Sequence, residues 1–316
     1  MAIGNHQTLD MPRALLTGAS SQIGLFAIPR LLDAGFKVIA VSRKGRPDTY
    51  PAFDGVEWLC REDALKLAET CQYMLSTGPM ELAQELLQHG GQFQTAVIFS
   101  SSSVISKRQS GNLAEKQMIQ GMLSSEAALE AIADQSGLKL VLFRPTLIYG
   151  CGLDSNISRL AGLIRRFGFM PLYAGAPGLR QPVHAGDLAA IAVKALLYEE
   201  ELPRILALGG GSTLTYKEMV SRIFVALDKP VRRVNVPHSR VVLLAKFSGI
   251  TGNGPGINAE MIKRQCIDLV FDDSEAREFL NYNPRPFAPT SEDFSLPEFF
   301  CISSCEDSMP HHPDDV

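Results

Sequence analysis

The segment Thr17-Gly18-Ala19-Ser20-Ser21-Gln22-Ile23-Gly24 decides the fold of this 316-residue chain. It follows an apolar run at residues 14–17 that predicts a buried strand, and an apolar run from Ile23 to about Ala34, ended by Gly35, predicts a helix. A turn of small residues between a strand and a helix places backbone N–H groups and the positive end of the helix dipole where they can hold a pyrophosphate. The segment therefore predicts a nicotinamide dinucleotide site at the start of a Rossmann-type domain.

Strands and helices alternate beyond this turn. Apolar runs predict strands at residues 37–41, 56–60, 71–75, 95–99 and 138–143, and helical patterns predict helices at residues 80–89 and 113–135. Pro29 lies inside the first helix and removes one hydrogen bond, so we expect a local kink there. Because parallel strands need crossover connections, the alternation predicts an α/β protein with a doubly wound parallel sheet.

The pattern becomes less regular after residue 150. We expect a dinucleotide-binding domain over residues 11–150, to which residues 183–208 return through a helix at 187–198 and a strand at 205–208. Residues 151–182 and 209–295 are expected to form a smaller, mainly helical substrate-binding lobe, with helices at 216–227, 239–247 and 258–265. Residues 1–10 and 300–316 are expected to be flexible tails.

The bulk composition favours a small diffusible substrate. A net charge of -4 with 20% charged residues gives no basic surplus for nucleic acid or an anionic membrane. No apolar stretch approaches the roughly 20 residues of a membrane span, and the first ten residues do not resemble a signal peptide, so we expect a cytoplasmic protein. The six scattered cysteines indicate reduced thiols. Cys301 and Cys305, with His311 and His312, could bind a metal, but their polar context favours a disordered end, and no metal is predicted.

The dinucleotide would contact Thr17, Gly18, Ser20, Ser21, Gln22, Ile23 and Gly24. Gly18 permits the tight turn and Gly24 the close packing of helix on sheet, while Ser21 or Gln22, depending on the register, replaces the usual middle glycine. Serine is small, and its hydroxyl could donate to a phosphate. The alternative is a strand-turn-helix unit that binds nothing.

The end of the second strand bears on the choice of dinucleotide. A carboxylate there would bind the 2′-hydroxyl of NAD, whereas an arginine accepts the 2′-phosphate of NADP. The sequence Val41-Ser42-Arg43-Lys44-Gly45-Arg46 has no acid and three cations. It favours NADP(H) over NAD(H), with Arg43 as the main contact and Lys44 beside it. The alternative is a solvated basic turn.

Four motifs resemble the extended short-chain dehydrogenases/reductases, and more narrowly the NAD-dependent epimerase/dehydratase family, which acts on nucleotide-sugars. They are the turn at 17–24, Phe99-Ser100-Ser101-Ser102-Ser103-Val104, Arg144-Pro145-Thr146-Leu147-Ile148-Tyr149-Gly150, and Arg180-Gln181-Pro182-Val183-His184-Ala185-Gly186-Asp187-Leu188-Ala189. The resemblance spans residues 12 to about 290. It implies a nucleotide-sugar bound between the large domain and the C-terminal lobe, and a possible homodimer paired through two helices that include residues 113–135.

The same resemblance implies roles for individual residues. Pro145 and Thr146, together with Arg144, would lie beside the nicotinamide, and Arg180 would meet the substrate diphosphate, a task that suits a guanidinium fork. Arg144, Tyr149 and Arg180 are therefore the expected substrate-binding residues. His184 and Asp187 are expected to fix the start of a helix, with Asp187 as its N-terminal cap.

The expected catalytic groups are incomplete. The family uses a serine or threonine after the fifth strand, here Ser101 or Ser102, and a Tyr and a Lys four residues apart on the next helix. Met122 and Glu126 occupy the positions of that Tyr and Lys, and no tyrosine occurs between Tyr73 and Tyr149. The usual acid/base pair is therefore absent.

Three hypotheses follow and stay open at this point. The chain is an oxidoreductase or epimerase with displaced catalytic groups, for which Lys107, Lys116, Tyr149 and Glu126 are candidates. Alternatively, it is a catalytically degenerate NADP(H)-binding scaffold or redox sensor. The third reading is a lyase or isomerase that uses the same cleft without hydride transfer.

Overall fold

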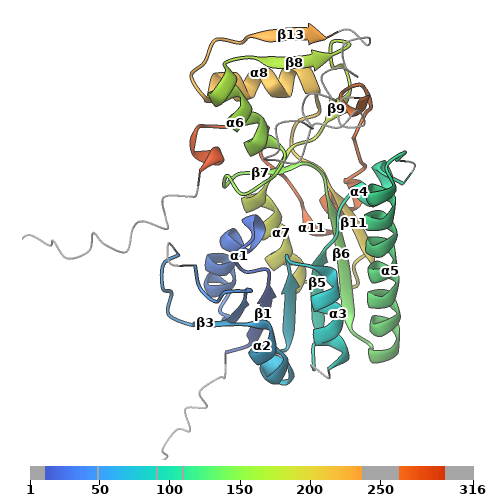
Figure 1. Cartoon of the computed structure of the whole chain (residues 1–316). Coiled ribbons are helices and arrows are strands. Elements are labelled where there is room, and N and C mark those ends of the chain that lie inside the picture. Colours follow the sequence, from blue (N-terminus) through green and yellow to red (C-terminus); the bar gives the residue numbers. More distant parts are fainter. Residues whose placement is uncertain (1–10, 48–49, 90–91, 109, 237–262, 296–316) are drawn as a thin grey trace, which may run out of the picture.

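The structure is a computed structural model that describes residues 11–47, 50–89, 92–108, 110–236 and 263–295. In this part of the chain, seven parallel strands form a central sheet in the order β11-β6-β5-β4-β1-β2-β3 (Figure 1). The strands are β1 (Arg13–Thr17), β2 (Lys37–Val41), β3 (Val56–Leu59), β4 (Tyr73–Ser76), β5 (Thr95–Phe99), β6 (Lys139–Pro145) and β11 (Ile205–Leu208). The predicted doubly wound α/β fold is confirmed.

Helices cover both faces of the sheet. One face carries α1 (Gln22–Asp33), α7 (Ala185–Leu196) and α11 (Ser274–Leu280), and the other carries α2 (Arg61–Leu67), α3 (Met80–Gln88) and α5 (Leu113–Ser136). Successive residues of β1 serve different cores: Leu16 packs with the α1 side and Leu15 with the α3 and α5 side. Burial on both faces explains why the strands are continuous apolar runs.

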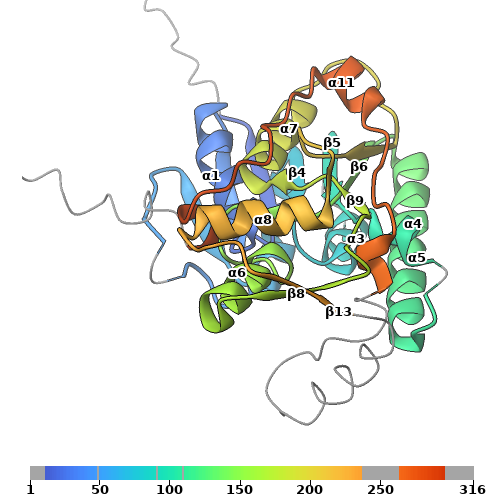
Figure 2. The ribbon, with the colours of Figure 1, turned by 90° about the horizontal axis from the view of Figure 1, so that it is seen from above.

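A smaller lobe lies over the carboxyl ends of the strands (Figures 1 and 2). It contains α6 (Ile157–Phe167), β8 (Met170–Tyr173), α8 (Tyr216–Ala226) and β13 (Arg233–Val236), packed around a core of its own. Short strand pairs join it to the main domain: β7 (Ile148–Tyr149) with β10 (Val183–His184), and β9 (Leu179–Arg180) with β12 (Leu214–Thr215). The remaining elements are α4 (Ser103–Ser106), η1 (Ala68–Thr70), η2 (Arg264–Cys266) and η3 (Glu292–Phe294).

The lobe differs from the prediction at its C-terminal end. Ala276 and Leu280 of α11 lie in the core formed with α1 and α7, so α11 returns to the sheet although it falls in the range expected for the lobe. The predicted helix at 239–247, residues 258–262 of the one at 258–265, the tails at 1–10 and 300–316, and Cys301 with Cys305 lie outside the described residues. No helix within the described ranges has the length and apolar character that a membrane span requires.

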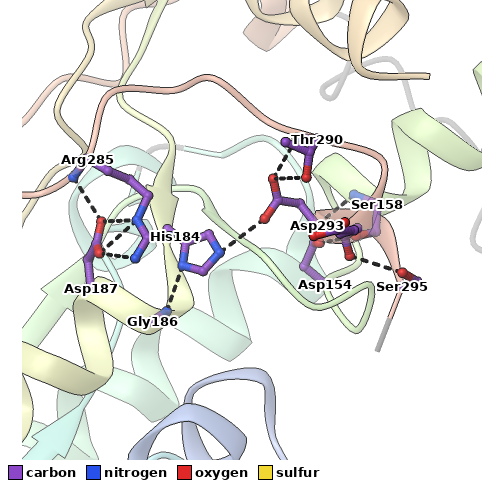
Figure 3. Close-up of polar contacts among 10 residues, drawn as sticks. Asp154, Ser158, His184, Gly186, Asp187, Arg285, Thr290, Asp293 and Ser295 are labelled. Carbon is purple, nitrogen blue, oxygen red and sulfur yellow. Dashed lines mark hydrogen bonds and ion pairs between the residues drawn. The ribbon is translucent and has the colours of Figure 1, made fainter. Parts of the chain in front are cut away.

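Polar contacts of Arg285 and Asp293 hold the segment that ends in η3 against α7 and the residue before it (Figure 3). The Nδ1 atom of His184 accepts a hydrogen bond from the N–H of Gly186, and its Nε2 donates to Asp293, 3.2 Å away. His184 is thus the N-terminal cap of α7. The capping role expected for Asp187 is wrong, because Asp187 lies in the first turn and its carboxylate pairs with Arg285 at 2.8 Å.

The hydrogen bond that Pro29 removes from α1 is replaced by one from a side chain outside the helix. Pro29 has no N–H, so the carbonyl of Leu25, four residues earlier, loses its helical donor. The hydroxyl of buried Tyr50 donates to that carbonyl at 3.0 Å. Tyr50 therefore supplies the hydrogen bond that Pro29 removes.

We predict that Tyr50→Phe lowers the free energy of unfolding by about 1–3 kcal/mol, because it leaves a buried carbonyl without a partner. In a Pro29→Ala background the same substitution should cost less, since the N–H restored at position 29 can bond to Leu25. Urea unfolding of the four proteins measures the difference. An equal cost in both backgrounds would contradict this account.

Candidate active site

The glycine turn lies in the crevice between β1 and β4, where the strand order of the sheet reverses. Gly18 has a φ of +66°, and a Cβ added there would lie 2.5 Å from the backbone N of Gly78 in the loop after β4. A Cβ on Gly24 would lie 2.4 Å from the carbonyl oxygen of Gly18. Both positions therefore require glycine, and the turn holds the start of α1 tightly against two strands.

Ser21 serves as the N-terminal cap of α1 at the place of the missing middle glycine. Its hydroxyl accepts from the N–H of Gly24 at 3.1 Å and donates to the hydroxyl of Thr77 at 2.9 Å. Thr77 in turn bonds the carbonyls of the turn itself. The N–H of Gly24 is thus satisfied within the protein. The N–H groups of Gln22 and Ile23, in the same helical turn, are left to donate to an anion.

The basic turn after β2 is exposed. The hydroxyl of Ser42 donates to the carbonyl of Gly45 and closes this turn. Arg43 and Lys44 point into solvent, and neither forms an ion pair with another described residue. A cation is therefore available at the position that selects between dinucleotides, whereas a carboxylate is not.

A cleft of about 690 Å³ opens where the sheet meets the lobe. Five predicted site residues line it: Gln22, Ser101, Ser102, Thr146 and Arg180. Lys107, a candidate for displaced catalysis, also lines it. The cleft thus runs from the first turn of α1, past the serine turn after β5, into the lobe.

Other predicted site residues do not line this cleft. Among the described residues, Arg144, Pro145, Tyr149, Lys116, Met122 and Glu126 are not part of its wall. Of the residues predicted to hold the dinucleotide, the wall also lacks Thr17, Gly18, Ser20, Ser21, Ile23, Gly24, Arg43 and Lys44. Tyr149 is 1% exposed and packs edge-on against the rings of His184 and Phe287, and burial raises the pKa of its hydroxyl. A proton-transfer role for Tyr149 therefore has no support in the geometry.

Glu126 forms a structural ion pair instead of facing the cleft. Its carboxylate, 3% exposed, accepts two hydrogen bonds from the guanidinium of Arg144 and one from the hydroxyl of Ser100. This ion pair connects α5 to β6. Met122, one helical turn before Glu126, packs against the hydrophobic core on the α3 and α5 side of the sheet. Arg144 is thus engaged inside the fold, away from the cleft where the resemblance places it.

Lys107 belongs to a charged cluster on the cleft wall. The ammonium of Lys107 lies 3.9 Å from the carboxylate of Glu115, which receives two hydrogen bonds of 2.8 Å from Arg264 and one of 2.6 Å from Ser110. Mainly because Arg264 donates to it, the pKa of Glu115 falls to about 2. Burial lowers the pKa of Lys107, and nearby Glu115 opposes that effect.

Arg180 lines the cleft, but its guanidinium also donates hydrogen bonds to backbone carbonyls. It donates to the carbonyls of Leu179, Ile267 and Arg264, and it lies over the ring of Tyr216, 5.4 Å from the centroid. Three of the five N–H donors of an arginine are therefore used on backbone. Only the remaining donors could meet a diphosphate.

Several residues of the wall escape prediction from sequence. They are Glu115, Arg159, Tyr173, Arg264 and Gln265. Glu115 and Arg264 are 149 residues apart, so no local pattern links them. Arg159 lies on the strongly amphipathic α6, which is the one signal that could have placed it beside a site.

The wall of the cleft is polar near the sheet and mixed on the side of the lobe. Serine hydroxyls, Lys107 and the acceptor oxygen of Gln22 lie near the sheet, and that buried oxygen has no hydrogen-bond partner among the described residues. On the side of the lobe, apolar Leu160 and Met219 line the cleft together with the cation Arg159. Such a cleft suits a ligand that has donor groups near the sheet and both apolar and anionic parts toward the lobe.

No protein-family model matches the chain. In sequence it is similar to the UDP-glucose 4-epimerase of Vibrio cholerae, with 26% identity over 166 residues, which are 52% of this chain and 48% of that protein. The match therefore spans about half the length of this relative.

Solved structures are similar over nearly the whole chain. The UDP-N-acetylglucosamine 4-epimerase of Bacillus cereus has a TM-score of 0.64 at 16% identity, covering 95% of this chain and 99% of that one. An epimerase of Methanothermobacter thermautotrophicus reaches 0.69 at 15% identity, covering 92% of each chain. The UDP-glucose 4-epimerase of Thermus thermophilus, in complex with NAD, reaches 0.63 at 19%, covering 92% and 99%. The chain is thus similar to epimerases in sequence and in structure, as the predicted resemblance implies, and at these identities the structures show the fold alone.

We predict that Glu115→Gln lowers the free energy of unfolding by an amount that depends on pH. The folded pKa of Glu115, about 2, lies below its ordinary value of 4.5, so its ionised form stabilises the fold above pH 4.5 and this contribution disappears as the pH falls toward 2. Urea midpoints of the two proteins should differ at neutral pH and converge in acid. Glu201→Gln, at an exposed position outside the helices and strands, is the control, and a constant difference at every pH would contradict the prediction.

Proposed function

We propose that this chain is a nicotinamide dinucleotide-binding protein of the epimerase/dehydratase type whose cleft takes a nucleotide-sugar or a similarly hydroxylated small molecule. The observation that carries the proposal is the continuity of the cleft, which joins the first turn of α1 at Gln22 to the serine turn and the lobe. The similarity to UDP-glucose 4-epimerase supports the same class.

The glycine turn fits a dinucleotide. The left-handed Gly18, the close packing of Gly24 and the N–H groups of Gln22 and Ile23 are what a pyrophosphate at a helix N-terminus needs. The hydroxyl of Ser21 takes one donor from that set. A bound nicotinamide would supply hydride acceptance or donation, while these residues hold and orient it.

The observations differ on whether the dinucleotide is NAD or NADP(H). The Thermus thermophilus epimerase is described with NAD, which favours NAD, so the preference for NADP(H) rests on the exposed cations Arg43 and Lys44 alone. Both dinucleotides belong in the test for that reason.

Lys107 is the strongest candidate for proton transfer in an enzyme of this kind. It lies on the same wall as Ser101 and Ser102, and burial moves its pKa toward neutrality, as a general acid or base requires. Glu115 is held as an anion by Arg264, and burial holds the pKa of the Tyr216 hydroxyl at about 12. In this proposal the amine of Lys107 exchanges a proton with a substrate hydroxyl.

A second candidate function is binding without turnover. It is favoured by the lack of the usual Tyr and Lys, by the placement of Glu126 in an ion pair with Arg144, and by the use of Arg180 on backbone carbonyls. In that case the cleft would bind its ligand with no change in it.

We predict that the protein binds NADH or NADPH, seen as a shift in the fluorescence of the reduced nicotinamide. If Arg43 contacts a 2′-phosphate, Arg43→Ala weakens NADPH binding by roughly tenfold, the order expected for one charge-assisted contact, and leaves NADH unchanged. Lys194→Ala, an exposed lysine on α7, is the matched control. Failure of both dinucleotides to bind would overturn the proposed function.

Turnover is first assayed with UDP-glucose, UDP-N-acetylglucosamine and UDP-glucuronic acid to find a nucleotide-sugar that the protein converts. We predict that Lys107→Met abolishes turnover of that nucleotide-sugar and leaves dinucleotide binding unchanged. General acid–base groups contribute roughly 10² to 10⁴ in rate. Lys116→Met removes an exposed lysine outside the cleft and should be silent. Equal turnover in both variants would exclude Lys107, and binding of a UDP-sugar with no turnover by the unmodified protein would favour the second function.

A further inference from the structure

The outer edge of the lobe carries exposed aromatic rings among unpaired arginines. Phe167 ends α6 and Phe169 precedes β8, and these side chains are 54% and 43% exposed. Arg166 lies in the last turn of α6, and Arg232 directly precedes β13; both are exposed. Arg165, in the same turn of α6, lies over the ring of Phe294 at 5.8 Å instead. We call Phe167, Phe169, Arg166 and Arg232 the basic-aromatic patch.

Hydrogen bonds and ring contacts show that the patch is one continuous surface. The N–H of Met170 donates to the carbonyl of Arg232 at 2.9 Å, which brings Phe169 beside the start of β13. The rings of Phe167 and Phe169 lie 6.5 Å apart, and the guanidinium of Arg166 lies over Phe167 at 5.1 Å. In Figure 1, β8 and β13 form the end of the molecule farthest from the amino ends of the sheet strands.

The charge of this surface differs in sign from that of the chain. The net charge of the chain is -4, yet residues 155–180 and 229–236 contain no aspartate or glutamate. Arg165, Arg166 and Arg232 form no ion pair with any described residue. The patch therefore projects an uncompensated positive field.

Helix stability explains only part of this arrangement. Arginines in a last helical turn complement the helix dipole, which accounts for Arg165 and Arg166. It does not account for Arg232 on another element, nor for two phenylalanines left half-exposed beside it. Aromatic rings flanked by cations are the combination that inserts at the boundary of acyl chains and anionic headgroups.

We propose that the basic-aromatic patch docks the protein on an anionic membrane surface, with Phe167 and Phe169 entering the headgroup region and Arg166 and Arg232 contacting lipid phosphates. The exposed aliphatic side chains of Val231 and Val234 beside the patch favour a lipid surface over a nucleic acid. This docking is peripheral and independent of the proposed cleft chemistry.

Sedimentation of the full chain with vesicles tests the proposal. We expect binding to phosphatidylcholine vesicles that contain phosphatidylglycerol, none to pure phosphatidylcholine, and loss of binding as salt is raised. Arg166→Ala with Arg232→Ala should weaken binding by roughly fivefold per arginine, and Phe167→Ser with Phe169→Ser should weaken it at every salt concentration. Leu113→Ser, which removes an apolar side chain 70% exposed on α5, is the matched control and should change nothing.

Any of four outcomes would overturn the docking proposal. They are no binding to either vesicle, equal binding to both, patch variants that bind as the unmodified protein does, and capture by single-stranded RNA but not by vesicles. Thermal melting and dinucleotide titration of the patch variants should match those of the unmodified protein. That match separates a failure of docking from a failure of the proposed function.

Discussion

The close approach of two glycines at the switch point of the sheet is the constraint on which the rest of the structure depends. Gly18 and Gly78 come so near that a single Cβ on Gly18 would contact the backbone of the neighbouring loop. This contact fixes where β1 ends, and therefore where α1 begins and which N–H groups it presents. The cleft starts at Gln22, the first residue of that helix, so its position follows from the same contact.

The fold could be predicted because its strands are continuous apolar runs. The strands at 37–41, 95–99 and 205–208 have the predicted limits, since each is an apolar run that ends at a serine or a glycine. The position of α11 could not be predicted in the same way. A short amphipathic helix has the same pattern against the lobe as against the sheet, and only the packing of Ala276 and Leu280 decides between them.

The site could be predicted only where backbone position determines function. Gly18, Ser101 and Thr146 follow strands of a parallel sheet, and the carboxyl ends of such strands lie together. Side-chain partners at long range escaped prediction. Glu126 occupies the position expected for the catalytic lysine, but it pairs with the guanidinium of Arg144. Of the candidates for displaced catalysis, Lys107, at the end of α4, lies on the cleft wall.

The contacts of Arg264 also bear on how the molecule is assembled. Arg264 meets Glu115 across 149 residues and Arg180 across 84, so this wall of the cleft closes only after most of the chain has been synthesised. Because N-terminal segments emerge first and distant contacts form slowly, β1, α1 and the glycine turn can form in a nascent chain before the cleft exists. The protein should therefore acquire its glycine turn before its cleft, and a translational pause or a truncation ahead of Arg264 would leave the serine turn and Lys107 open to solvent.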